Sequence, residues 1–438
     1  MMTSNKINYK EAYVWIWLPE ETQPVVSGKL TVEGKSLVFN YGQSYLSRDN
    51  GISIFKNELP LTAGILPLLN GLTMPGCIRD AAPDAWGRRV ILNKKFGKKV
   101  DAANIELSEL TYLLESGSDR IGALDFQQSN TVYEPRISVN TSLDELLESA
   151  EKVQKGIPLT PELDQALHHG SSIGGARPKA LITDGNFKYV AKFSASSDIY
   201  SVVKAEFVAM RLAHMASLNV APVKLVKSLQ KDVLLIERFD RVLSVHGWQR
   251  KSMLSALTIL NLDEMMARYA SYEDLAQTIR KDFRQSASAL KELFSRIVFN
   301  ILSGNTDDHA RNHAAFWDGK MLELTPAYDI CPQGRTGFEA SQAMLISGND
   351  RASQIASCLT AAHVFLISRK EAMALIEHQI ESISNHWSAV CEVAELNQVD
   401  RKLLWGRQFL NPYAFYGLSE DAKYLENMAK HLRQKNQS

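Results

Sequence analysis

The segment from Ser286 to Ile301 constrains the fold of this 438-residue chain more than any other stretch. Its apolar residues form a wide stripe that other elements must cover. The segment therefore predicts a buried helix within a helical domain. Gly304 is expected to end this helix, since glycine readily adopts the backbone conformation that follows a last helical turn. The stripe has the i, i+3, i+4, i+7 spacing of one helix face, at Leu290, Leu293, Phe294, Ile297, Val298 and Ile301.

The ten residues from Gly304 to His313 read G-N-T-D-D-H-A-R-N-H and are nearly all polar. Asp307 and Asn312 form a D-x-x-x-x-N pattern, and Asp329 follows in L-T-P-A-Y-D-I. This order suits phosphoryl transfer, in which one carboxylate orients a hydroxyl and accepts its proton. An amide oxygen and a second carboxylate then hold Mg²⁺ at the nucleotide phosphates. We therefore predict Asp307 as the catalytic base and Asn312 and Asp329 as metal ligands.

The two histidines of this stretch leave a second interpretation open. His309 and His313 are four residues apart, so on a helix they would share a face and could bind zinc with Asp307 or Asp308. No acid with a general-base role lies between them, as one does in H-E-x-x-H sites. We instead expect His309 to lie near the nucleotide or in packing, and His313 to lie at the surface.

A nucleotide site also needs a cation and a close-fitting loop at the phosphates. Lys192 lies mid-strand in Y-V-A-K-F-S, where strand alternation places the amine on the face opposite its two neighbours. Glu206 on the following helix is the candidate partner of that amine, although each residue alone also suits a solvated position. Gly174 and Gly175 would let the preceding loop approach an anion closely.

The segment L-L-I-E-R-F-D-R ends a run of strands around one helix, which predicts a small mixed lobe followed by helices. We interpret it as the connector whose backbone meets adenine near Glu237 and Phe239, with Asp240 reaching the ribose. The expected α+β chain divides into a β-rich N-terminal subdomain, a mixed lobe and a helical lobe, over residues 1–155, 156–242 and 243–438. Trp86 is expected to pack between domains.

Composition narrows the class of protein further. The 49 Lys and Arg residues balance the 49 Asp and Glu residues, so no overall positive field attracts the chain to nucleic acid or membranes. The four cysteines show no C-x-x-C spacing, which argues against a disulfide framework or structural zinc. No signal-peptide core and no membrane-length apolar run is present. We therefore expect a cytoplasmic protein.

The chain resembles the HipA family of serine/threonine kinases, the toxins of type II toxin–antitoxin modules. The resemblance extends over essentially the whole chain, in the motifs P-D-A-W-G-R-R, S-I-G-G-A-R-P-K, L-L-I-E-R-F-D-R, N-T-D-D-H-A-R-N and L-T-P-A-Y-D-I. It implies a protein-kinase-like core with a mixed N-lobe and an all-helical C-lobe, and it implies ATP and Mg²⁺ as cofactors. It also implies a protein substrate such as an aminoacyl-tRNA synthetase. The implied partner is a HipB-like helix-turn-helix antitoxin, through which DNA is contacted only indirectly.

The resemblance repeats the roles given above to Asp307, Asn312, Asp329 and Lys192, and adds Lys179 and His309 at the nucleotide. It further implies that Ser172 is a regulatory autophosphorylation site in the phosphate loop. A phosphate there would add about two negative charges beside the ATP phosphates and would act as an off-switch.

The chain departs from the family pattern at two places. Asp308 stands where the family usually has glycine, which is tolerable if the side chain points to solvent. Arg177 and Pro178 precede Lys179 where the family commonly has Gln-Glu, and Pro178 removes one N–H that could contact phosphate.

Two other functions remain open from the sequence. One is a small-molecule kinase of the aminoglycoside-phosphotransferase type, which shares the D-x-x-x-x-N pattern and a later aspartate. The other is a pseudokinase that acts as a binding partner of a DNA-binding antitoxin.

Overall fold

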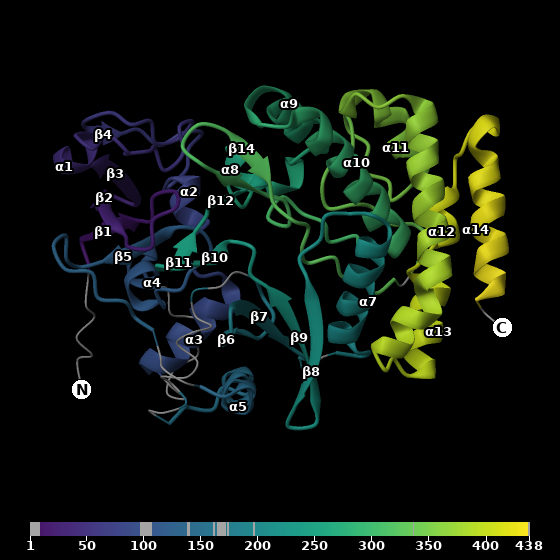
Figure 1. Ribbon diagram of the computed structural model, residues 1–438, viewed down its shortest axis with the longest axis horizontal. Coiled ribbons are helices and arrows are strands. Elements are labelled where there is room, and N and C mark those ends of the chain that lie inside the picture. Colours follow the sequence, from purple (N-terminus) through teal and green to yellow (C-terminus); the bar gives the residue numbers. More distant parts are fainter. Residues whose placement is uncertain are drawn as a thin grey trace.

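The computed structural model describes residues 9–96, 107–137, 141–160, 163, 172, 175–195, 198–335 and 337–436. An N-terminal sheet, a second sheet and a block of helices follow one another across the molecule (Figure 1). The α+β class predicted from the sequence is therefore confirmed. The predicted domain boundaries stay a prediction.

The N-terminal part contains an antiparallel five-stranded sheet in the order β4-β3-β2-β1-β5. Its strands are β1 (Glu11–Ile16), β2 (Val25–Glu33), β3 (Ser36–Tyr41), β4 (Ile65–Leu66) and β5 (Leu124–Gln127). Strands β2 and β3 form a hairpin, with Gly34 at a φ of 61° in its turn. Strand β5 escaped prediction because all four of its residues are buried and show no alternation.

The second sheet is antiparallel and has the order β6-β7-β9-β8. Its strands are β6 (Lys179–Asp184), β7 (Phe187–Phe193), β8 (Val223–Ser228) and β9 (Lys231–Glu237). Ala191 and Phe193 pack on one face with Trp86 of α3 (Ala85–Phe96) and with α5 (Leu143–Gln154). Lys192 faces α7 (Val202–Met215) on the other side, as strand alternation predicts. The packing of Trp86 between the N-terminal part and this lobe is also as expected.

The rest of the chain is mainly helical and lies on the far side of the second sheet (Figure 1). Its α-helices are α8 (Ala256–Ile259), α9 (Tyr272–Asp282), α10 (Ser286–Ser303), α11 (Ile355–Ala361), α12 (Arg369–Val393), α13 (Gln398–Arg407) and α14 (Lys423–Lys435). The lobe differs from an all-helical one by a small sheet of three short strands, β12 (Ser252–Ser255), β13 (Ala314–Trp317) and β14 (Leu322–Leu324). These strands are only three or four residues long, too short to show a period in the sequence.

Helix α10 is the buried helix that the apolar stripe predicts. All six stripe residues are at most 1% exposed. Gly304 ends the helix in the left-handed conformation, with a φ of 73°. A Cβ at this position would lie 3.0 Å from the Cα of Gln408, so the close approach requires glycine as well. This sharp ending directs the following residues away from the helix axis.

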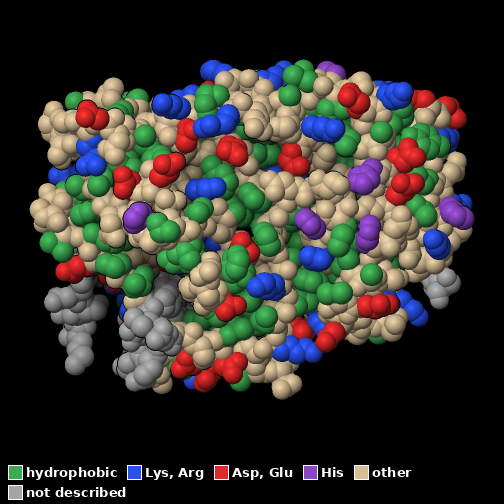
Figure 2. Space-filling view, in the orientation of Figure 1, with side chains coloured by type: hydrophobic (Ala, Val, Ile, Leu, Met, Phe, Trp, Pro, Cys, Tyr) green, Lys and Arg blue, Asp and Glu red, His purple; other side chains and the backbone are tan. Residues whose placement is uncertain are grey.

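Within the described residues, no helix combines the length and the apolar character needed to cross a bilayer. On the face shown in Figure 2, basic and acidic side chains are interspersed rather than separated into patches of one sign. That pattern agrees with the equal numbers of acidic and basic residues.

Candidate active site

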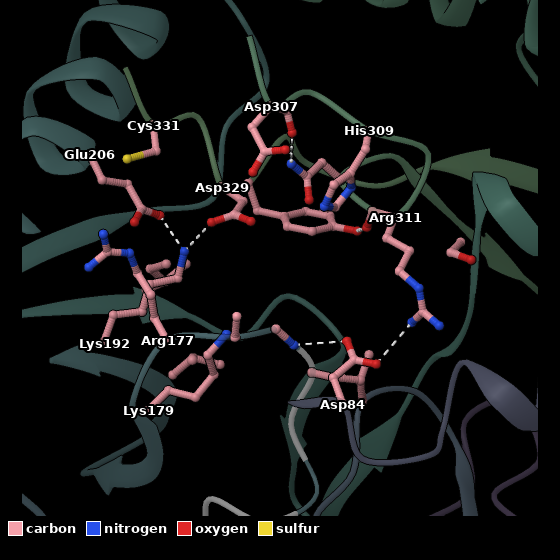
Figure 3. A pocket seen from close by; sticks show the side chains of 18 of the residues that line it. Asp84, Arg177, Lys179, Lys192, Glu206, Asp307, His309, Arg311, Asp329 and Cys331 are labelled. Carbon is pink, nitrogen blue, oxygen red and sulfur yellow. Dashed lines mark hydrogen bonds and ion pairs between the residues drawn. The ribbon is translucent and has the colours of Figure 1, made fainter. Parts of the chain in front are cut away.

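A cavity of about 440 Å³ opens between the second sheet, the loop after α10 and the segment before α3 (Figure 3). It brings together residues that the sequence places far apart. The predicted residues among its lining are Gly175, Lys179, Lys192, Glu237, Phe239, Asp240, Asp307, His309, Asn312 and Asp329. Gly174, the other predicted nucleotide residue, lies outside the described part of the chain.

Lys192 lines the cavity and contacts two carboxylates there. Its Nζ donates to Glu206 Oε1 at 2.6 Å, and it also forms an ion pair with Asp329. Burial lowers the pKa of Lys192, but the carboxylates of Asp329 and Glu206 outweigh this and hold it above its ordinary value. The amine therefore stays charged, and the predicted lysine–glutamate pair is present.

Asp329 and Asn312 offer oxygen atoms to the same cavity. Asp329 has a φ of 59°, a left-handed conformation that is uncommon for residues other than glycine and that often marks functional positions. Burial opposes its ionisation, yet Lys192 and Lys179 lower the pKa of Asp329 to about 2. The Asn312 amide nitrogen donates to the backbone oxygen of Asp307 at 3.1 Å, which leaves the amide oxygen for a ligand. One carboxylate and one amide oxygen fit the hard, oxygen-seeking Mg²⁺ ion.

Asp307 projects from the loop after α10 into the cavity (Figure 3). Partial burial raises the pKa of Asp307, His309 opposes this rise, and the negative charge of Asp329 adds to it. A raised pKa makes a carboxylate a better proton acceptor. The geometry and the charge environment both suit the role of a general base.

Asp308 and His313 behave differently from what the sequence suggests. The expectation that His313 lies at the surface is wrong, because this residue is 2% exposed, and Asp308, which would be tolerable if it pointed to solvent, is 3% exposed and points inward. The His313 Nε2 lies 2.9 Å from Asp308 Oδ2, and the Tyr272 hydroxyl donates to the same oxygen. Asp308 points into the protein interior, while its neighbour Asp307 lines the cavity. His313 likewise points into the interior, while its neighbour Asn312 lines the cavity.

This inward pair also removes the basis of a zinc site. The loop is not helical, so His309 and His313 do not share a helix face; His309 lines the cavity while His313 is bonded to Asp308. Across the residues that the structure describes, no cluster of three potential metal-binding His, Cys, Asp or Glu side chains occurs.

The connector lines the cavity, but two of its polar groups are already hydrogen-bonded to other parts of the protein. The Glu237 N–H donates to Pro222 and the Asp240 carboxylate accepts from Arg238, Arg241 and the Gly122 N–H. The structure thus favours a structural role for Asp240 over contact with a ribose. The Phe239 ring lies 5.7 Å from that of Tyr328, which gives the cavity an aromatic wall suited to a base.

The phosphate loop is described from Gly175 onward and at Ser172. Ser172 is 2% exposed, and its hydroxyl donates to the backbone oxygen of Asp119 at 3.3 Å. Burial and the positive charge of Lys192 lower the pKa of Lys179 to about 8. The amines of Lys179 and Lys192 lie at the same end of the cavity (Figure 3).

Sequence reasoning missed Asp84 as a cavity residue. Its carboxylate accepts from the Gly175 N–H at 2.8 Å and lies 3.4 Å from Arg311. Both contacts join positions far apart along the chain, so no local pattern could have revealed them. Arg88, by contrast, pairs with Glu109 at 2.6 Å, away from the cavity.

This fold and this set of cavity residues define a kinase-like α+β protein. The chain matches the HipA N-terminal domain over residues 17–127 and the HipA-like C-terminal domain over residues 171–387. Together these matches cover well over half of the chain, and the protein belongs to the HipA family.

Three named relatives agree with this membership. The serine/threonine-protein kinase toxin HipA of Shewanella oneidensis is 27% identical over 186 residues, which cover 36% of this chain and 42% of that protein. The putative kinase Y4mE of Sinorhizobium fredii is 25% identical over 209 residues, covering 43% and 48%. A putative kinase of Haemophilus influenzae is 26% identical over 196 residues, covering 40% and 56%. These matches span about half the length of the relatives.

The fold is also that of a HipA chain solved in complex with HipB and operator DNA from Shewanella oneidensis. The two chains superpose with a TM-score of 0.63 over 94% of each, at 18% sequence identity.

Proposed function

We propose that this protein is a HipA-type serine/threonine kinase that transfers the γ-phosphoryl group of ATP to a protein. The observation that carries the proposal is the convergence of Asp307, Asn312 and Asp329 with the Lys192–Glu206 pair on one cavity. Kinases that use this set of groups work mainly by positioning and by electrostatic stabilisation.

In the proposed reaction, Asp307 orients the serine or threonine hydroxyl of the acceptor and takes its proton. The hydroxyl oxygen then bonds to the γ-phosphorus as the bond to the β-phosphate oxygen breaks, and ADP leaves with that bond's electrons. Lys192, kept charged by two carboxylates, binds the phosphates, and Lys179 adds a second cation beside them. Asn312 and Asp329 would hold Mg²⁺, which supplies positive charge against the charge that develops on the phosphates.

Asp329 faces two partners in this scheme. It is bound to Lys192 in the structure, and the same carboxylate would serve as a magnesium ligand. Because a divalent cation offers more charge than an ammonium group, we expect Asp329 to turn from Lys192 to the metal when ATP–Mg²⁺ binds.

Regulation by Ser172 is part of the proposal. The hydroxyl is buried against Asp119, so phosphorylation requires the loop to leave this position first. A phosphate with about two negative charges would not return to this buried position against the Asp119 backbone oxygen. Autophosphorylation would therefore keep the loop out and the kinase off.

The acceptor protein and the inhibitor follow from the family. We propose that the target is a protein such as an aminoacyl-tRNA synthetase. A HipB-like antitoxin would neutralise the kinase and connect it to DNA, which agrees with the mixture of charges on the surface (Figure 2). A cytoplasmic location is part of this proposal.

Transfer of labelled phosphate from ATP–Mg²⁺ to the protein itself, and to proteins of a cell extract, tests the proposal. Wild-type protein should become labelled, with a phosphopeptide at Ser172. Asp307→Ala should lose transfer while keeping ATP binding and its melting temperature, because Asp307 only lines the cavity and has no ion-pair partner among the described residues. Continued labelling of Asp307→Ala would refute the role of Asp307. Failure of wild-type protein to bind ATP–Mg²⁺ would refute the function itself.

A further inference from the structure

The segment that leads into α3 belongs to the N-terminal part of the chain, yet it grips the phosphate loop. Asp84 Oδ2 accepts from the Gly175 N–H at 2.8 Å, and the Trp86 N–H donates to the Gly175 oxygen at 3.1 Å. The Trp86 indole Nε1 donates to the Lys179 backbone oxygen at 2.8 Å. Three hydrogen bonds thus fix the loop over the stretch from Gly175 to Lys179, which includes the glycine at a φ of 99°.

The same carboxylate extends to the opposite wall of the cavity. Asp84 Oδ1 lies 3.4 Å from Arg311 Nη1, and Arg311 belongs to the loop that carries Asp307 and Asn312. Figure 3 shows Asp84 at the edge of the cavity with its carboxylate directed toward Arg311, and the Gly175 N–H contacts the other carboxylate oxygen. One side chain therefore joins the phosphate loop to the catalytic loop.

Occupying the position of a nucleotide phosphate is an alternative role for Asp84, but two observations favour a positioning role. Its negative charge is matched by Arg311, whose own second partner is Glu264. The Gly175 oxygen is bonded to Trp86 at the same time, so this segment of backbone is docked on α3 through both of its polar groups. A loop held in place before the ligand arrives loses less conformational freedom when the ligand binds.

We propose that Asp84 is a positioning residue that holds the phosphate loop and the catalytic loop in their nucleotide-binding arrangement. The N-terminal part of the chain thereby completes the cavity. This inference rests on the proposed ATP-dependent function for its kinetic consequence, whereas the docking of the loop is a property of the nucleotide-free protein.

Three variants of the full chain test it. Asp84→Ala removes both contacts, and Asp84→Asn keeps an oxygen that can accept from Gly175 but removes the charge that faces Arg311. Glu109→Ala is the matched control, because Glu109 binds Arg88 of α3 and its side chain is 34% exposed, close to the 27% of Asp84, but it does not line the cavity.

Hydrogen exchange in the absence of nucleotide provides the first measurement. Backbone amides of residues 175–177 should exchange at least about tenfold faster in Asp84→Ala than in wild-type protein, as expected when a docked segment is released. Asp84→Asn should be intermediate and Glu109→Ala unchanged. Equal exchange in Asp84→Ala and Glu109→Ala would overturn the docking role.

ATP kinetics provide the second measurement. Asp84→Ala should raise the KM for ATP about tenfold or more, with partial rescue in Asp84→Asn and no change in Glu109→Ala, because preorganisation contributes to binding. A lower KM would show that Asp84 competes with the phosphates, and an unchanged KM despite faster exchange would show that the docking has no part in nucleotide binding. Either result overturns the proposal. If wild-type protein binds no ATP, the proposed function fails, and the exchange comparison still decides the docking.

Discussion

Lys179 is a cavity residue whose charge changes close to neutral pH. Burial and the charge of Lys192 lower its pKa to about 8 from an ordinary value of 10.5. At pH 7 the amine is mostly protonated, so its positive charge favours the ATP phosphates. As pH rises through about 8 it loses this charge in the free protein.

We therefore predict that kcat/KM for ATP falls as pH rises from 7 to 9, with an apparent pKa of about 8. Lys179→Gln should have a lower kcat/KM that does not fall through this window.

The deprotonation of Lys179 affects the stability of the fold with the opposite sign. Between about pH 8 and 10.5 the unfolded chain binds more protons at this lysine than the folded chain, so its contribution to stability rises with pH. A fall in kcat/KM that parallels a fall in melting temperature would contradict this assignment.

Side chains that meet through regular structure could be predicted from the sequence, and those that meet through irregular loops could not. Lys192 and Glu206 lie on a strand and the next helix, where alternation and helical spacing limit their directions. Asp308 and His313 meet because the loop turns between them, and their third partner, Tyr272, comes from α9. A single sequence does not specify that turn, so the role of the charged Asp308 could not be predicted.

At the scale of elements, the loop after α10 is held by its inward-facing residues. Gly304 turns the chain away from the helix axis. The 2.9 Å contact between His313 Nε2 and Asp308 Oδ2 then anchors the loop on its buried side. Burial opposes the ionisation of Asp308, but His313 and Tyr272 keep its pKa below the ordinary value. The loop is thus anchored on one side while Asp307 and Asn312 project on the other.

Asp308→Ala should therefore lower the free energy of unfolding by about 3 kcal/mol, because it leaves His313 and the Tyr272 hydroxyl buried without this acceptor. It should also lower kcat by at least about tenfold, since small displacements of catalytic groups are costly. Chemical denaturation and steady-state kinetics check the two effects.

Asp282→Ala is the matched control for Asp308→Ala. The Asp282 side chain is 9% exposed and pairs with Lys56 at 2.9 Å, but it does not belong to the cavity. The control should lose stability while keeping kcat. If Asp308→Ala loses stability but keeps kcat, the contact stabilises the fold without positioning Asp307.

At the scale of the whole molecule, a buried ionic network joins the N-terminal part to the second sheet and its connector. Asp119 Oδ1 accepts from Arg238 and Arg241 at 2.9 Å each, and Asp119 Oδ2 accepts from Lys188 at 2.8 Å. Asp240 binds the same two arginines. Burial opposes the charge on Asp119, but Arg238 and Arg241 hold its pKa well below the ordinary value.

This network explains why the N-terminal part and the kinase-like lobe should behave as one cooperative unit. The guanidinium groups of Arg238 and Arg241 are 1% exposed, so neither can exchange its carboxylate for water without opening the interface. The backbone of Asp119 also accepts the Ser172 hydroxyl. The interface and the predicted regulatory serine are thus linked through one residue.

We predict that Asp119→Ala lowers the free energy of unfolding by about 3 kcal/mol or more, because it leaves buried arginine charges undercompensated. Asp421→Ala is the contrasting control, since Asp421 pairs with Arg369 at the surface, where both side chains are more than 40% exposed, and should leave stability unchanged. Denaturant unfolding followed by tryptophan fluorescence and circular dichroism measures both variants. Coincident transitions in wild-type protein would support one cooperative unit. An Asp119→Ala variant as stable as the Asp421→Ala control would contradict the coupling, because two buried arginines would then have lost a carboxylate without consequence.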